Sequence, residues 1–247
     1  ELRCPEASLL ARLWPALGAE FGQGVLVERA DHEERANAPL DQSLHRLPPG
    51  WRLPALPPSV AWSTGEVPAD TGVMLLNAVM GVEVGTDIIW EYTEKFKAPM
   101  IFAVNKLDDD NADFEKTVRE AKAHFGNNVV VVQYPRQTGS GFHEIIDVLR
   151  MTNYVFRDEG GKPEKHPIPD EEKERADALH KELIEAIASN DEGLMEKYFE
   201  KGELDEDEMK EGLKKAMIHH DLFPLFCLSA ERNMGSGRLM GFIDNVC

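Results

Sequence analysis

The chain has 247 residues, with 45 Asp or Glu against 27 Lys or Arg, so its formal net charge at pH 7 is −18. A hydrophobic fraction of 42% is enough to build a core, which excludes a wholly disordered chain. The excess of acid argues against specific or charge-driven contact with DNA. No uncharged apolar run approaches the roughly 18 residues that a membrane span needs, so no membrane partner is expected.

Cysteine and histidine spacing points away from metal or disulfide chemistry. The three cysteines, Cys4, Cys227 and Cys247, form no CxxC pair, and the eight histidines show neither C2H2 nor HExxH spacing. A reducing compartment is therefore expected. The chain starts at Glu1 rather than at Met and shows no secretory signal, so we expect a natural N-terminus that lies further upstream.

Residues 1–69 differ in composition from the rest of the chain. No Lys precedes Lys95, and nine of the fifteen prolines lie in this leader. Proline removes a backbone donor and favours an extended predecessor, so the run 39–68 is interpreted as loop, linker or disorder. A helix at 8–17 and a short strand at 25–28 are the only elements predicted here, and the leader is left unassigned.

Buried strands and amphipathic helices alternate from residue 71 onward. Continuous apolar runs predict strands at 73–78, 99–104 and 129–133. Helical spacing of apolar residues predicts helices at 84–96 and 112–125. This alternation indicates βαβ units with right-handed crossovers, and therefore an α/β fold built on a parallel sheet.

Residues 151–220 interrupt this alternation. Three helices with acidic first turns are predicted there, at 170–189, 192–201 and 205–218. A buried strand at 225–229 and a helix at 237–246 then resume the earlier pattern. The sequence therefore predicts a sheet that is interrupted by a mostly helical insert.

The strand at 99–104 ends in Asn105-Lys106-Leu107-Asp108, an N-K-x-D motif at the edge where open α/β sheets bind ligands. The Asp108 carboxylate can accept hydrogen bonds from the ring N–H and the exocyclic amine of guanine, a donor pair that adenine lacks. The aliphatic stem of Lys106 can lie on the flat base. The Asn105 amide can tie neighbouring loops together.

The strand at 225–229 ends in Ser229-Ala230, a position that supplies a backbone N–H to the guanine carbonyl oxygen in guanine-nucleotide folds. Together the two motifs favour guanine recognition over the alternative, an ordinary strand exit with an Asx turn. Two other candidates are set aside. His219-His220 is interpreted as an exposed polar pair, and His143 as a loop residue without a catalytic partner.

Residues 70–247 resemble the G domain of bacterial elongation factor G, specifically the elongation factor G-like branch common in Bacteroidetes. The matching text includes ADTGVMLLNAVMGVEVGTDIIWEYTEKFKAPMIFAVNKLD and DLFPLFCLSAERNMGSGRLMGFIDNV. The resemblance implies a P-loop-GTPase-type sheet, with the first part of a G domain at 70–150 and its resumption at 221–247. The insert at 151–220 resembles the G′ subdomain, which in this family faces the ribosomal stalk protein.

The resemblance implies a cytoplasmic translational GTPase that acts with GTP and Mg²⁺ on the ribosome. It assigns guanine recognition of GTP or GDP to five residues: Asn105, Lys106, Asp108, Ser229 and Ala230. Two positions depart from the family pattern, since Glu231 stands where many relatives have Lys and Asn77 where many have Asp.

The larger departure is a missing phosphate site. The family's P-loop, GxxxxGK followed by Ser or Thr, occurs nowhere in the sequence, and Asp158-Glu-Gly-Gly fits the D-x-x-G switch by letters alone. We therefore expect a sheet without its first strands, without the ligands of Mg²⁺ and without a catalytic residue. Such a chain can recognise a base but cannot hydrolyse GTP.

Three functions remain open at this stage. The first is a translational GTPase fragment, truncated at both ends, whose N-terminal part is replaced and which is hydrolytically inactive. The second is a non-catalytic module whose acidic insert binds the ribosome through the stalk protein. The third is an unusual complete GTPase in which residues 1–69 supply a phosphate-binding element, for which Gly22-Gln-Gly24 is the one hint.

Overall fold

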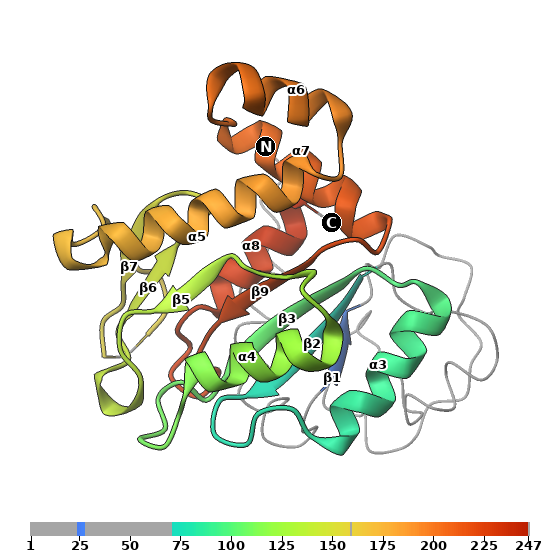
Figure 1. Cartoon of the computed structure of the whole chain (residues 1–247). Coiled ribbons are helices and arrows are strands. Elements are labelled where there is room, and N and C mark those ends of the chain that lie inside the picture. The colour runs from blue at the N-terminus through green and yellow to red at the C-terminus, as the bar shows by residue number, and fades with distance from the viewer. Residues whose placement is uncertain (1–23, 28–70, 159, 247) are drawn as a thin grey trace, which may run out of the picture.

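The computed structural model describes residues 24–27, 71–158 and 160–246, which form two sheets and six α-helices (Figure 1). The main sheet has five strands. In spatial order they are β1 (Gly24–Val27), β2 (Thr71–Asn77), β3 (Met100–Asn105), β9 (Phe223–Cys227) and β4 (Val129–Val131).

The predicted parallel sheet is confirmed. Strands β2, β3, β9 and β4 are parallel to one another. Strand β1 lies at the edge of the sheet and pairs antiparallel with β2. Every residue of β3 and β9 is buried, as expected for strands covered on both faces. The strand predicted at 25–28 is found at 24–27, whereas the helix predicted at 8–17 lies outside the described residues.

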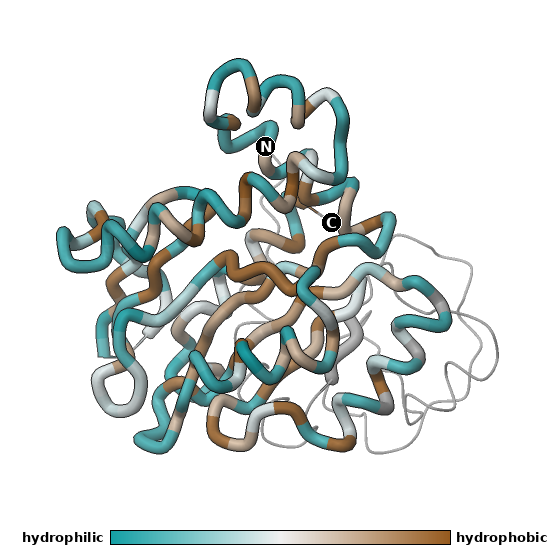
Figure 2. The backbone as a smooth tube through the Cα atoms, viewed as in Figure 1, coloured by the Kyte–Doolittle hydropathy of each residue, from teal (hydrophilic) through white to brown (hydrophobic). Residues whose placement is uncertain are grey.

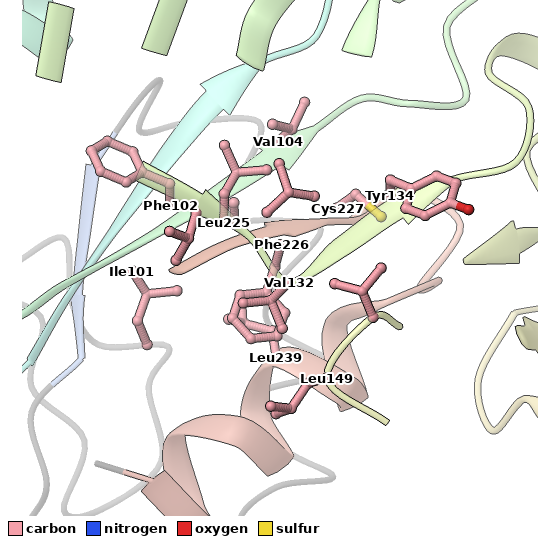
Figure 3. Close-up of a cluster of buried hydrophobic side chains, with 14 of the residues drawn as sticks. Ile101, Phe102, Val104, Val132, Tyr134, Leu149, Leu225, Phe226, Cys227 and Leu239 are labelled. Atoms are coloured by element: carbon pink, nitrogen blue, oxygen red, sulfur yellow. The ribbon is translucent and has the colours of Figure 1, made fainter. Parts of the chain in front are cut away.

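Three helices accompany this sheet, namely α3 (Val84–Phe96), α4 (Phe114–Phe125) and α8 (Ser236–Val246). Helix α4 begins later than its pattern predicts because the Asp113 side chain accepts the Lys116 N–H at 2.8 Å and so caps the first turn. Helix α8 covers β9 and its neighbours, and Figure 3 shows Leu239 of this helix close to Phe226 of β9.

The run predicted as one strand at 129–133 divides between two sheets. Strand β4 ends at Val131, and Val132 bridges the sheets, since its N–H donates to Leu225 O and its carbonyl accepts the Val148 N–H. The chain then enters a second, antiparallel sheet. Its strands are β5 (Gln133–Pro135), β6 (Glu144–Asp147), β7 (Thr152–Val155) and β8 (Glu164–His166).

This second sheet spans the boundary expected between the first part of the G domain and the insert. Asp147 of β6 pairs with Thr152 of β7, so position 150/151 lies inside a hairpin rather than between two units. The sequence pattern missed the sheet because its strands have only three or four residues. Strands this short carry too little periodicity to identify.

The three helices predicted in the insert are confirmed. They are α5 (Asp170–Ala188), α6 (Glu192–Lys201) and α7 (Glu206–Ile218). Aspartates cap two of them: Asp191 accepts the Gly193 and Leu194 N–H groups, and Asp205 forms a capping box with Glu208. Much of the outer surface of α5–α7 is hydrophilic, while the central strands of the main sheet are mostly hydrophobic (Figure 2).

The insert is fixed to the main sheet by charged and aromatic contacts around α4 and α5. Arg175 forms an ion pair with Glu115 of α4, and its guanidinium lies 4.1 Å above the centroid of the Tyr134 ring. Lys122 of α4 pairs with Glu182 of α5 at 2.7 Å. Within the described part of the chain, no helix combines the length and the apolar character needed to cross a bilayer.

The expected exposure of the His219-His220 pair is wrong for His220, which is 7% exposed. Helix α7 ends at Ile218, and His220 adopts a left-handed φ of 65° that turns its ring inward. Its Nδ1 lies 3.1 Å from Ala98 O, and its Nε2 lies 3.1 Å from Glu94 Oε1. A histidine pair in sequence thus separates into a surface residue and a buried contact between the insert and α3.

Two helical glycines make a matched prediction about how tightly the insert is packed. A Cβ at Gly212 of α7 would lie 2.5 Å from Ile187 Cγ2 and from Leu194 Cδ1, whereas a Cβ at Gly241 of α8 meets nothing within 4 Å. We expect Gly212→Ala to lower the free energy of unfolding by about 1–2 kcal/mol through overpacking. Gly241→Ala should raise it by about 0.5–1 kcal/mol. Urea denaturation measures both, and a stabilising Gly212→Ala would contradict the close helix approach.

Candidate functional site

Both sequence motifs lie at the edge where the parallel strands of the main sheet end. Asn105 is the last residue of β3, and Ser229 follows β9 by two residues. Val104 is paired with Cys227 across these parallel strands, so the loops that leave β3 and β9 start side by side. The structure therefore brings the two motifs together at the position where α/β sheets bind ligands.

A buried hydrogen bond joins the two loops directly. Asn105 is 6% exposed, and its Oδ1 accepts the Ala230 N–H at 3.0 Å. The carbonyl of Asn105 also accepts the Ala78 N–H at 2.9 Å, which connects the loop after β2 to the same point. The expectation that the Asn105 amide ties neighbouring loops together is thus confirmed.

The same bond changes the role expected for Ala230. Its N–H was expected to serve a guanine carbonyl oxygen, but here it donates to Asn105. A base receives this N–H only if the bond to Asn105 opens or is shared. Ser229 is fully buried, and its backbone exchanges hydrogen bonds of 2.9 and 3.0 Å with Met234. The backbone hydrogen bonds between Ser229 and Met234 therefore close the 229–234 turn, and Ser229 is not accessible to solvent.

The loop after β3 carries Lys106 and Asp108 on either side of one apolar anchor. Leu107 is fully buried, whereas Lys106 is exposed and has a left-handed φ of 64°. The Asp108 side chain is 14% exposed, and its Oδ2 lies 3.7 Å from Arg232 Nε. Lys106 and Asp108 thus flank the buried Leu107 beside the 229–234 turn.

A third loop, which the sequence motifs do not reveal, completes the site. The Gly139 N–H donates to Leu107 O at 2.8 Å, and the Ser140 N–H donates to Asp110 Oδ1 at 3.0 Å. Gly139 has a φ of +75°, and a Cβ there would lie 3.0 Å from Asp110 Oδ1 and 3.3 Å from its Cα. The sequence Gly139-Ser140-Gly141 is typical of a loop, but no sequence pattern predicts that this loop lies against the N-K-x-D motif.

Two polar pairs border the site, namely Asp109 with Asn111 and His143 with Asp158. Hydrogen bonds from the backbone and the side chain of Asn111 lower the pKa of Asp109. His143 of the third loop lies 2.8 Å from Asp158 Oδ1, and a hydrogen bond to the Gly141 backbone together with this carboxylate raises the pKa of His143. His143 lies in a loop, as interpreted from the sequence, but it has a carboxylate partner, Asp158, which the sequence did not imply.

The loops after β3 and β9 carry one carboxylate and one exposed lysine on the same edge of the sheet. Asp108 offers two carboxylate oxygens beside the solvent-facing Lys106, as recognition of the guanine N–H pair requires. No group of three or more His, Cys, Asp or Glu side chains in the described ranges is arranged to hold a metal ion.

Comparison with known proteins gives two matches. Residues 61–247 match the family described as the elongation factor Tu GTP binding domain, so the match starts before the boundary at residue 70 expected from the sequence. A crystal structure described as ttk003000868 from Thermus thermophilus matches with a TM-score of 0.65 at 28% sequence identity. This match covers 72% of the present chain and 26% of that chain, so the protein spans about a quarter of that relative's length.

The Asn105–Ala230 hydrogen bond predicts a local loss of protection. Asn105→Ala leaves the buried Ala230 N–H without its acceptor, which should cost about 1–3 kcal/mol in the free energy of unfolding. Amide hydrogen exchange should accelerate at Ala230, and urea denaturation gives the global cost. The control is Asn111→Ala in the same loop, an exposed amide whose loss should change neither. Unchanged exchange at Ala230 would contradict the bond.

The His143–Asp158 pair predicts a pH dependence. Because the folded-state pKa of His143 is raised, this pair stabilises the fold below the unfolded value of about 6.5 and loses that contribution as pH rises through the folded pKa. NMR titration of the His143 ring should give a pKa above the ordinary value, and Asp158→Asn should lower it. An Asp158→Asn protein with the same His143 titration would show that the pair does not form.

Proposed function

The chain belongs to the elongation factor Tu GTP binding domain family, and from this premise we propose that the edge formed by β3 and β9 recognises the guanine base of GTP or GDP. Membership places the chain among the translation-factor GTPases. The observation that carries the proposal is the Asn105–Ala230 hydrogen bond. It holds the loop that carries Asp108 against the 229–234 turn, so that one base can touch both.

Each residue of the site has a distinct proposed role. Asp108 accepts the ring N–H and the exocyclic amine of guanine, and Lys106 covers one face of the base with its aliphatic stem. Asn105 keeps the two loops in register. Ser229 and Ala230 form the wall beside the guanine carbonyl oxygen, with the Ala230 N–H shared between that oxygen and Asn105.

We further propose that the chain is the elongation factor G-like type common in Bacteroidetes and that it acts on the ribosome in the cytoplasm. The quoted sequence match supports this finer assignment. Contact with the ribosomal stalk protein through the 151–220 insert is also a proposal. It is supported by Phe199 of α6, whose side chain is 79% exposed on this insert. The same observation favours the second candidate, a ribosome-binding module without catalysis.

GTP hydrolysis by this chain is not proposed. Phosphoryl transfer in this class depends on a P-loop, Mg²⁺ and a switch that orders the attacking water. The P-loop string does not occur in the sequence. The proposal is therefore base recognition without turnover, and GTP hydrolysed by the purified chain above the buffer rate would overturn it.

The test changes the base specificity expected of Asp108 from guanine to xanthine. Asp108→Asn removes one acceptor that guanine needs and offers an amide N–H that suits the second carbonyl of xanthine. We expect guanosine binding to weaken by about ten- to a hundredfold, because a donor of the base is left unpaired. Xanthosine should gain affinity. Chemical-shift titration at millimolar nucleoside measures both, and an excess of adenosine should not compete.

The matched control is Asp109→Asn, which makes the same change one residue further along, at a side chain held by Asn111. It should leave guanosine affinity within about twofold of the parent, as expected for an exposed charge. If Asp108→Asn and Asp109→Asn behaved alike, guanine recognition by Asp108 would be wrong.

A further inference from the structure

Arg232 reaches from the turn after β9 to the carboxylate expected to read guanine. Its Nε lies 3.7 Å from Asp108 Oδ2, and its Nη1 donates to Ser140 O at 3.4 Å. The guanidinium thus contacts both the N-K-x-D loop and the third loop of the site. Neither the sequence motifs nor the resemblance assigns a role to this residue.

The backbone of Arg232 is held firmly at this position. Its N–H donates to Ser229 Oγ at 3.1 Å, inside the turn closed by Ser229 and Met234. Its carbonyl lies against Gly160 of the insert, where a Cβ would come within 1.9 Å of that oxygen. The Gly161 N–H donates to Asn233 O at 2.9 Å. The side chain therefore leaves a fixed point and extends toward Asp108.

The guanidinium lies close enough to the carboxylate to compete for it with a base. Guanine recognition needs both oxygens of Asp108, one for the ring N–H and one for the exocyclic amine. Arg232 lies beside Oδ2, and the arginine and aspartate side chains are 32% and 14% exposed. A base that binds therefore displaces the guanidinium or shares Asp108 Oδ2 with it, because each carboxylate oxygen can accept from more than one donor.

We propose that Arg232 is a built-in competitor of guanine for Asp108, an inference that rests on the proposed function. In the free protein the guanidinium neutralises the specificity carboxylate and keeps it oriented. On binding, the base takes over the carboxylate, and the guanidinium moves toward solvent while its backbone stays fixed. Guanine affinity is then set by the difference between these two partners.

The competition has a signature that a purely structural arginine lacks. Guanosine is uncharged, so its own contacts depend little on ionic strength. A partly exposed ion pair weakens as salt screens it. Guanosine affinity of the parent protein should therefore rise with salt. Once the arginine is removed, this salt dependence should disappear.

The experiment compares the parent chain with Arg232→Met and Arg232→Gln, using guanosine and chemical-shift titration at low and at high salt. Both variants should bind guanosine about two- to fivefold more tightly than the parent at low salt, the factor expected for the loss of one partly exposed ion pair. Arg119→Met, at an exposed arginine on α4, is the matched control and should change neither affinity nor salt dependence. Urea denaturation confirms that each variant is folded.

A second measurement observes the contact without any ligand. The Arg232 Nε–Hε resonance of the free protein should shift in Asp108→Asn and stay unchanged in Asp109→Asn. An unshifted resonance in Asp108→Asn would overturn the proposal, whatever the binding data show.

The outcomes separate this inference from the proposed function. If Asp108→Asn abolishes guanosine binding while the Arg232 variants bind like the parent or more weakly, the guanine site stands and the competition is wrong. If neither the parent chain nor any Arg232 variant binds guanosine, the proposed function fails and the competition fails with it. Tighter, salt-independent binding by both Arg232 variants supports both.

Discussion

The parallel pairing of β3 with β9 is the constraint on which the rest of the structure depends. These strands are neighbours in the sheet, yet the hydrogen bond between the loops that follow them joins residues 125 positions apart. The pairing holds because both strands are buried along their whole length, and moving their apolar side chains into water would cost far more than any loop closure. The chain that leaves β3 must therefore form α4, β4, the second sheet and three helices and still return to the place beside β3.

That requirement shapes the insert. The antiparallel sheet that leads into the insert begins directly after β4, and the last helix of the insert ends where the chain re-enters the main sheet at β9. A buried carboxylate lies at this junction. Asp147 accepts Gln133 Nε2 at 2.8 Å and the Arg150 N–H at 3.0 Å, while burial raises its pKa. A buried charge is costly unless it is hydrogen-bonded, so these bonds favour one register of β5 against β6.

The proposed base site follows the same logic on a smaller scale. Its positions are fixed by backbone and amide hydrogen bonds that are largely buried, such as the bond from Ala230 to Asn105. The groups proposed to meet the base, Lys106 and Asp108, lie outside this frame, and Asp108 faces the guanidinium of Arg232. A rigid frame with exchangeable charges can select guanine through two donors of the base alone.

The sequence by itself determined the elements with strong local signals. The buried strands, the amphipathic α4, the three insert helices and the identity of the N-K-x-D and Ser-Ala motifs all follow from apolar periodicity, caps and residue chemistry. The tertiary structure alone decided what depends on distant neighbours. The four short strands of the second sheet, the burial of His220, the use of the Ala230 N–H by Asn105 and the approach of Arg232 to Asp108 belong to this group. The physical reason is range: periodicity records which face of one element is buried, whereas a hydrogen bond or ion pair between loops exists only after the sheet has set their separation.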